Sequence, residues 1–196
     1  MGIKSEYLKL AFEPSVLQRL SKEKNYKYEV THIGGYGPIH NERNKILEEA
    51  AKRVKIDFWG YAIDNLDGNS PILKNYHGEC WGIDLYDILS SSKITLTKHI
   101  ASVASNYANN MRLYEATGCG TLLLVDKKDN LGEIFEIGKE VVAYENVDDL
   151  VDKIKYYLEH EEEREKIVKA GQERTFREHT YEVRMKELVS ILERYL

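Results

Sequence analysis

The chain has 196 residues, of which 42% are hydrophobic and 31% charged, a composition typical of a globular domain. The 28 Lys and Arg against 33 Asp and Glu give a net charge of -5, which argues against a domain that binds nucleic-acid phosphates. No apolar run approaches the ~20 residues of a membrane-spanning helix, and residues 1–10 lack the apolar stretch of a signal peptide. The only cysteines, Cys80 and Cys119, are too few for a disulfide framework, so we expect a reduced, cytoplasmic protein.

Residues 1–24 are expected to form an extended strap, because Pro14 pushes Glu13 out of helical dihedral angles. Residues 25–196 alternate between strand-like runs and segments with apolar residues at helical spacing. The expected strands are residues 28–33, 55–63, 94–97, 121–125 and 140–144. The expected helices are residues 41–54, 84–89, 109–117 and 131–135, followed by helical segments from Asn146 to the C-terminus. This alternation predicts an α/β fold, a Rossmann-like doubly wound parallel sheet with a helical C-terminus.

In doubly wound sheets, ligands bind at the carboxyl ends of the strands, where the following loops and helix N-termini meet. This rule selects residues 34–40, 98–112 and 126–130. Within them, Asn109 and Asn110 are expected to cap a helix whose first turn offers unpaired backbone N–H groups. Such a helix end attracts phosphate without needing a basic side chain.

Two charged residues follow on nearly the same face of this expected helix. Arg112 offers a planar donor fork suited to phosphate oxygens, and Glu115 lies three residues further on. A carboxylate at that position can accept hydrogen bonds from a ribose diol, as the acidic residue of dinucleotide folds does. The alternative is that Arg112 and Glu115 pair with each other on a solvated face.

The segment from Asn109 to Gly120 resembles the nucleotide-binding helix of GT-B glycosyltransferases of the group 1 type, and of CgeB-like proteins in particular. Further segments resemble the family in the same order: the linker at residues 10–14, the first strand and glycine turn at 30–35, the signature at 131–142, and the C-terminal helices at 171–184. The similarity therefore covers nearly the whole chain. It implies the C-terminal, nucleotide-sugar-binding half of a GT-B fold.

The resemblance also implies roles for individual residues. The ribose hydroxyls would be held by Glu115, and the leaving diphosphate would be stabilised by the amides around Asn109 to Arg112. The expected catalytic residues are His99 and Arg112, and the expected nucleotide-sugar-binding residues are Gly34, Gly35, Lys98, Asn109, Asn110, Met111, Arg112 and Glu115. One departure stands eight positions before Glu115, where many retaining relatives carry a glutamate and this chain has Tyr107.

A second departure concerns the domains. We expect a linker-like strap at residues 1–24 and one domain at 25–196, which leaves no room for the acceptor-binding half of a GT-B enzyme. The implied function is a hexosyltransferase-like donor domain that binds a UDP-type nucleotide sugar without a metal or other cofactor. It would need an N-terminal domain, a partner chain or a second copy to act on an unknown acceptor. The alternative is a non-catalytic nucleotide-binding or assembly module with a vestigial site.

Several other side chains are assigned structural roles. His32 is expected in the core or on a domain face, His40 at a helix start, and residues 126–129 in a charged loop. The strap residues Tyr7, Leu8 and Phe12 are expected to lack cover, which favours a partner interface. The last helix carries Met185, Leu188, Leu192 and Leu196 on one face.

Overall fold

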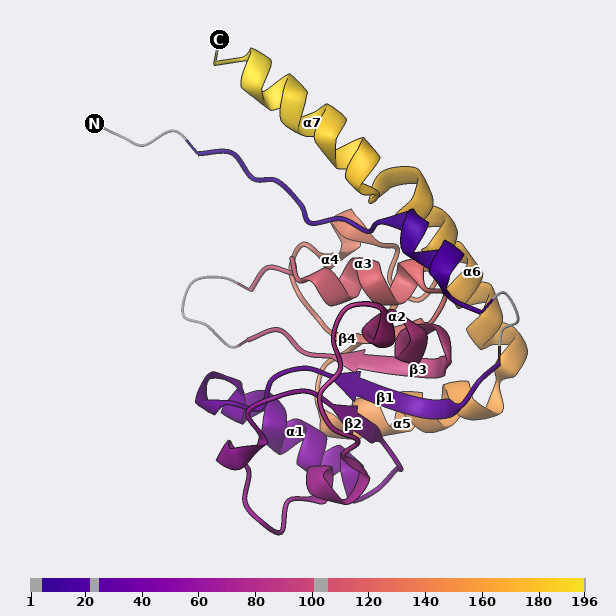
Figure 1. Cartoon of the computed structure of the whole chain (residues 1–196). Coiled ribbons are helices and arrows are strands. Elements are labelled where there is room, and N and C mark those ends of the chain that lie inside the picture. The colour runs from indigo at the N-terminus through magenta and orange to yellow at the C-terminus, as the bar shows by residue number, and fades with distance from the viewer. Residues whose placement is uncertain (1–4, 22–24, 101–105, 196) are drawn as a thin grey trace.

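The computed structural model describes residues 5–21, 25–100 and 106–195, so parts of the strap and of the 98–112 loop lie outside the described residues. Five parallel strands form one sheet in the order β2-β1-β3-β4-β5 (Figure 1). The strands are β1 (Tyr28–Ile33), β2 (Asp57–Trp59), β3 (Ser92–Thr97), β4 (Leu122–Asp126) and β5 (Val142–Tyr144). The architecture is the α/β doubly wound sheet that the sequence predicts.

Helices cover both faces of the sheet (Figure 1). One face packs against α1 (Asn41–Ala51) and α5 (Val147–Glu159), and the other against α2 (Ile83–Ser90) and α3 (Met111–Gly118). The remaining helices are α4 (Leu131–Ile134), α6 (Glu161–Glu178) and α7 (Tyr181–Glu193), and short 3-10 helices cover Pro14–Arg19, Pro38–His40, Ile63–Asn65 and Pro71–Asn75. No helix in the described part of the chain is long and apolar enough to cross a membrane.

Strand β4 illustrates how the sequence builds two cores. All five of its residues are buried. Because side chains alternate along a strand, Leu122 and Leu124 join the core under α1 and α5, whereas Leu123 and Val125 join the core under α2 and α3. An uninterrupted apolar run therefore fits a strand that is covered on both faces.

Strand β2 is shorter than the expected residues 55–63. It ends at Trp59 because the next residue, Gly60, has φ +141, and a Cβ there would lie 1.7 Å from the carbonyl oxygen of Gly34. Only glycine fits this approach between two loops. At Gly60 the chain therefore leaves the sheet, beside the loop that follows β1.

The strap is tied to the C-terminal helices. The backbone of Phe12 donates to the carbonyl of His179 at 2.8 Å and accepts from the N–H of Tyr181 at 3.0 Å. The Phe12 ring is buried and lies against Phe176. The expectation that Phe12 lacks cover is thus wrong, because α6 and α7 fold back onto the strap, whereas Tyr7 remains exposed.

Candidate functional site

A cavity of about 500 Å³ opens where the strand order reverses. The chain passes from β1 to β2 on one side and then to β3 on the other side of β1, and this reversal is where doubly wound folds bind their ligands. The cavity is lined by the ends of β1 and β3, the first turn of α1 and the N-terminus of α3, namely by His32, Ile33, His40, Arg43, Leu85, Thr97, Lys98, His99, Ile100, Tyr107, Asn109, Asn110, Met111, Arg112 and Glu115.

The N-terminus of α3 is capped as its sequence predicts. The side chain of Asn110 accepts a hydrogen bond from the N–H of Leu113 at 3.2 Å. An α-helix gives no internal partner to its first amides, and the N–H groups of Met111 and Arg112 have no acceptor among the described residues, so they can donate to a ligand or to water. Asn109 has a different use, because its side chain accepts from the backbone of Leu10 at 3.1 Å and ties the strap to this helix.

Arg112 and Glu115 pair, as the alternative prediction held, but they do not lie on a solvated face. Their ion pair joins Nη1 and Oε2 at 3.0 Å, and the two side chains are only 12% and 10% exposed. The second guanidinium nitrogen of Arg112 donates to the carbonyl of Ile33 at the end of β1, at 3.2 Å. The pair therefore forms part of the cavity wall and connects α3 to the end of β1.

Arg43 is a cavity residue that the sequence analysis did not identify. Its guanidinium is buried and donates to the carbonyl of Gly35, and no carboxylate pairs with it among the described residues. Burial lowers the pKa of Arg43, and nearby tyrosines oppose this effect. A sequence signal was present, because Arg43 lies on the buried stripe of α1 with Leu47 and Ala50.

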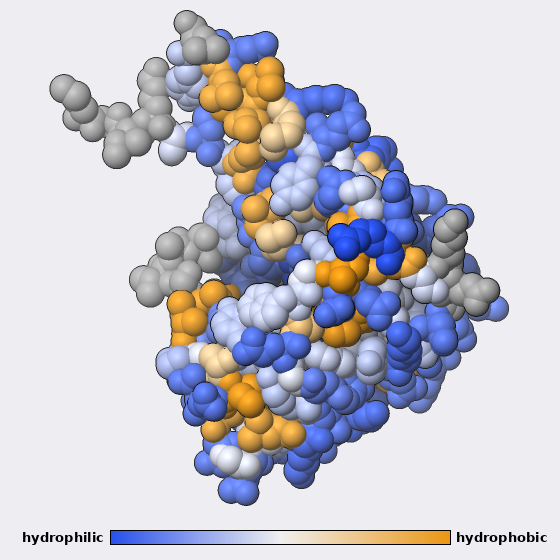
Figure 2. Space-filling view, viewed as in Figure 1, coloured by the Kyte–Doolittle hydropathy of each residue, from blue (hydrophilic) through white to orange (hydrophobic). Residues whose placement is uncertain are grey.

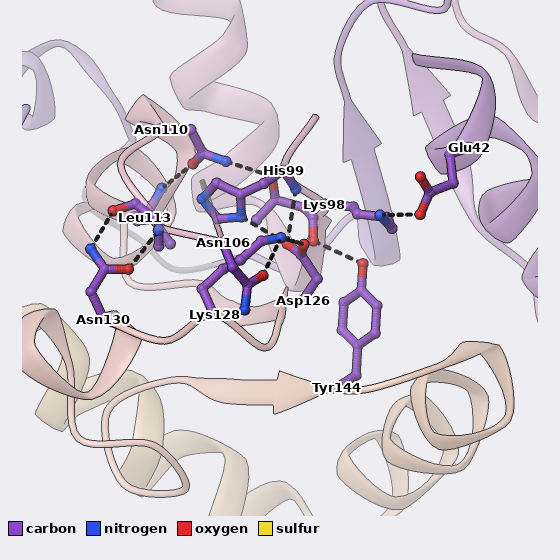
Figure 3. Close-up of polar contacts among 12 residues, drawn as sticks. Glu42, Lys98, His99, Asn106, Asn110, Leu113, Asp126, Lys128, Asn130 and Tyr144 are labelled. Atoms are coloured by element: carbon purple, nitrogen blue, oxygen red, sulfur yellow. Dashed lines mark hydrogen bonds and ion pairs between the residues drawn. The ribbon is translucent and has the colours of Figure 1, made fainter. Parts of the chain in front are cut away.

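His99 is held by the end of β4. Its ring Nδ1 lies 2.7 Å from Oδ1 of Asp126, which also accepts from the backbone N–H of His99 at 2.8 Å (Figure 3). Lys128 approaches Oδ2 of Asp126 at 3.2 Å. The expectation that residues 126–129 form a charged loop is therefore wrong for Asp126, which is buried as the last residue of β4.

Lys98 points away from this group. Its ammonium donates to the carboxylate of Glu42 at 3.0 Å (Figure 3). The Lys98 side chain is nearly buried, and it lines both this cavity and a second one of about 760 Å³ beside β4 and β5. The Lys98 charge is thus already paired at the border between the two cavities.

The glycine pair after β1 serves close packing of loops. A Cβ on Gly35 would lie 2.7 Å from the ring of Tyr61, and one on Gly34 would lie 3.1 Å from the ring of His32. Neither glycine lines the cavity. Of the predicted site residues, the structure brings all but Gly34 and Gly35 to the cavity wall.

Two histidines assigned to structural roles also reach the cavity. The Nδ1 atom of His32 lies 3.1 Å from the hydroxyl of Tyr36. The ring is buried, and burial holds the pKa of His32 well below its usual range. His40 precedes α1 as expected but makes no capping hydrogen bond with its side chain. The described residues include no cluster of three or more His, Cys, Asp or Glu side chains that could hold a metal ion.

Solved structures with this fold include glycosyltransferases. HepE from Anabaena, solved with UDP-glucose, superimposes with a TM-score of 0.71 at 13% identity, over 93% of this chain and 56% of HepE. Sucrose-phosphate synthase from Thermosynechococcus elongatus gives 0.67 at 11% identity, over 95% and 51%. The C-terminal domain of the glycosyl transferase group 1 family protein LpcC from Francisella tularensis gives 0.57 at 15% identity, over 92% and 100%.

The present chain thus spans about half the length of HepE and of sucrose-phosphate synthase. No curated protein sequence matches it significantly. The profile of the glycosyl transferase-like family matches residues 43–190. The chain therefore belongs to the glycosyl transferase-like family and has the fold of a GT-B C-terminal domain.

Proposed function

We propose that the cavity binds the nucleoside diphosphate of a sugar nucleotide and that this chain is the donor-binding half of a glycosyltransferase. The observation that carries the proposal is the cavity at the strand reversal, where the buried guanidinium of Arg43 faces the same space as the α3 N-terminus and the Arg112–Glu115 pair. The match of HepE, solved with UDP-glucose, supports UDP-glucose as the first donor to test.

The diphosphate would lie between α1 and α3. Arg43 would supply positive charge from α1, and the amides of Met111 and Arg112 would supply hydrogen bonds from α3. These groups are fixed before the ligand arrives, since Arg43 is tied to Gly35 and Arg112 to Ile33. Preorganised donors of this kind stabilise a departing diphosphate without reorganisation.

The ribose would lie against Glu115. One carboxylate oxygen pairs with Arg112, and the other can accept from ribose hydroxyls. The buried ion pair keeps this carboxylate oriented toward the cavity. The same proposal includes three further points: the chain is a CgeB-like protein, it transfers a hexose, and it binds the donor without a metal.

Transfer to an acceptor would require a surface that faces the donor cavity. In the proposal, an N-terminal GT-B domain, a partner chain or a second copy provides that surface. Without it, the acceptor is not positioned against the donor sugar, and transfer is slow even when the donor is bound.

Calorimetry with UDP-glucose, UDP and GDP on the wild-type chain and on Glu115→Gln tests the proposal. The substitution removes a charged acceptor from a buried site, so we expect affinity for the nucleotides to fall roughly tenfold or more. Glu133→Gln, an exposed change on α4, should bind as the wild type does. Absence of wild-type binding would refute the proposal, and equal affinity of Glu115→Gln would remove Glu115 from the site.

A further inference from the structure

The contact between His99 and Asp126 joins two strand ends that are 27 residues apart in sequence. Oδ1 of Asp126 accepts from both the backbone N–H and the ring Nδ1 of His99, while Oδ2 faces Lys128 (Figure 3). The side chains of His99 and Asp126 are 9% and 10% exposed. The orientation of the imidazole ring is therefore fixed by contacts within the protein.

These contacts also decide where the ring proton lies. Burial alone would raise the pKa of Asp126, but the hydrogen bonds from His99 and the charge of Lys128 lower it below its ordinary value. An ionised carboxylate can only accept hydrogen bonds. The Nδ1 atom of His99 must then carry a proton, and a ring with that single proton has Nε2 as an acceptor.

The Nε2 atom of His99 is enclosed and has no hydrogen-bond partner in the part of the chain that the structure describes. A buried acceptor without a partner destabilises the protein unless water or a ligand supplies a donor. His99 belongs to the wall of the 500 Å³ cavity, together with Thr97 and Asn110. A ligand in that cavity that displaces the atoms enclosing Nε2 can therefore supply the missing donor.

The chemistry of Nε2 selects the part of the ligand. Near neutral pH, the diphosphate of a sugar nucleotide carries no O–H group and cannot donate to a ring acceptor. The hydroxyl groups of the ribose and of the transferred sugar can donate. With its single proton on Nδ1, the His99 ring thus fits a sugar hydroxyl and not a phosphate oxygen.

We propose that Asp126 is a positioning residue that holds His99 in the Nδ1–H tautomer, so that Nε2 accepts a hydrogen bond from a sugar hydroxyl of the bound nucleotide. The inference rests on the proposed function, since it names the part of the donor that one wall of the cavity recognises. The ribose and the transferred sugar are two sources of the same hydroxyl chemistry, and the ligands used in the test distinguish them.

The first test is the tautomer itself, measured in the ligand-free chain by long-range ¹H–¹⁵N NMR of the histidine rings. We expect wild-type His99 to carry its proton on Nδ1. Asp126→Ala removes the acceptor and should move part of the proton population to Nε2. Asp126→Asn should restore the Nδ1–H form, because its carbonyl can still accept from the two His99 donors and Lys128 keeps its hydrogen bond to Asn106. A wild-type ring protonated on Nε2 would overturn the inference.

The second test is affinity for UDP-glucose and for UDP by calorimetry. Asp126→Ala should weaken binding roughly tenfold, and Asp126→Asn should recover most of that loss. Asp129→Ala, which removes an exposed carboxylate in the loop after β4, should bind as the wild type does. A loss confined to UDP-glucose assigns the hydroxyl to the transferred sugar, whereas a loss with both ligands assigns it to the ribose.

The variant His99→Gln distinguishes the loss of the contact between Asp126 and His99 from general damage to the fold by Asp126→Ala. The glutamine side chain places an amide oxygen near the position of Nε2 without needing Asp126, so adding Asp126→Ala to His99→Gln should cost little further affinity. If Asp126→Ala costs the same affinity with and without His99→Gln, Asp126 acts independently of His99 and the inference is overturned.

If the wild type binds and Asp126→Ala binds equally well, this inference fails alone. If the wild type binds neither ligand, the proposed function fails first.

Discussion

Arg43 is a buried charge on the wall of the candidate site. Burying a guanidinium without a carboxylate is unfavourable, and in the described part of the chain the only hydrogen-bond acceptor of Arg43 is the carbonyl of Gly35. The Nε atom of Arg43 has no hydrogen-bond partner there. Such a side chain is stabilised when an anion enters the cavity that it lines.

Replacing Arg43 therefore separates binding from stability. We expect Arg43→Met to weaken binding of UDP roughly tenfold or more, because a hydrogen bond between two charged groups is lost. The same substitution should not lower the free energy of unfolding by more than about 1 kcal/mol, since the buried charge disappears with its hydrogen bonds. Calorimetry and urea denaturation measure the two quantities.

Lys45→Met is the matched control for this experiment, because Lys45 lies on the exposed side of the same helix. It should change neither UDP affinity nor stability. If Arg43→Met bound UDP as tightly as Lys45→Met, Arg43 would not contact the diphosphate.

At the scale of elements, helix α6 shows how tightly the C-terminal helices are fitted to the sheet domain. A Cβ on Gly171 would lie 2.3 Å from the carbonyl oxygen of Glu140, just before β5, and 3.5 Å from Thr117 of α3. The hydroxyls of Thr117 and Thr175 are 2.6 Å apart across the same contact. Helix α6 thus holds α3, and with it the N-terminus that faces the cavity.

Gly171→Ala should destabilise the fold even though alanine favours helix. The added methyl group meets backbone that cannot rotate away, so we expect a loss of about 1–3 kcal/mol in the free energy of unfolding. Gly132→Ala in α4 is the comparison, because a Cβ there meets nothing within 4 Å. It should be neutral or stabilising by up to about 1 kcal/mol. Equal effects in urea denaturation would mean that α6 can shift away from β5.

At the scale of the whole molecule, the two ends of the chain lie together. Figure 1 shows the strap and α7 at the same end, and the Glu6 carboxylate accepts from the hydroxyl of Tyr195 at 2.6 Å. Of the apolar face expected on the last helix, Met185 is 45% and Leu192 is 52% exposed, Leu188 is partly buried, and the neighbouring Val189 is 54% exposed. Figure 2 shows apolar side chains gathered there. Tyr7 of the strap is exposed as well, whereas Phe12 is buried.

The whole fold should lose stability in mild acid. Burial lowers the pKa of His179 to about 4, although its hydrogen bond to the Ile134 carbonyl opposes that shift, and burial holds the pKa of His32 well below its usual range. In the unfolded chain, both rings have a pKa of about 6.5. Protonation therefore favours unfolding, and the stability present above about pH 6.5 is lost progressively toward pH 4.

Urea denaturation at about pH 7.5 and about pH 5 measures this loss. His179→Gln should reduce the difference between the two pH values, because one buried imidazole no longer has to take up a proton. His160→Gln, an exposed change at the end of α5, should keep the full difference. A pH difference unchanged in His179→Gln would show that His179 does not contribute to it.

The amino-acid sequence by itself determined the elements and one segment of the site. The order of strands and helices follows from local periodicity, and β1 spans the expected residues 28–33. The segment from Asn109 to Glu115 was predicted as part of the candidate site because a helix cap, an arginine and a carboxylate lie within two turns of one helix. Such local signals do not depend on how the strands are ordered.

Only the tertiary structure decided which distant side chains meet. The contact of Arg112 with Ile33 joins residues 79 apart, and that of His99 with Asp126 joins residues 27 apart. Both depend on β1 and β4 lying on either side of β3, an order that periodicity along the chain does not specify. The physical reason is that strand pairing and helix packing set the positions of side chains across elements, whereas periodicity sets only which face each residue occupies.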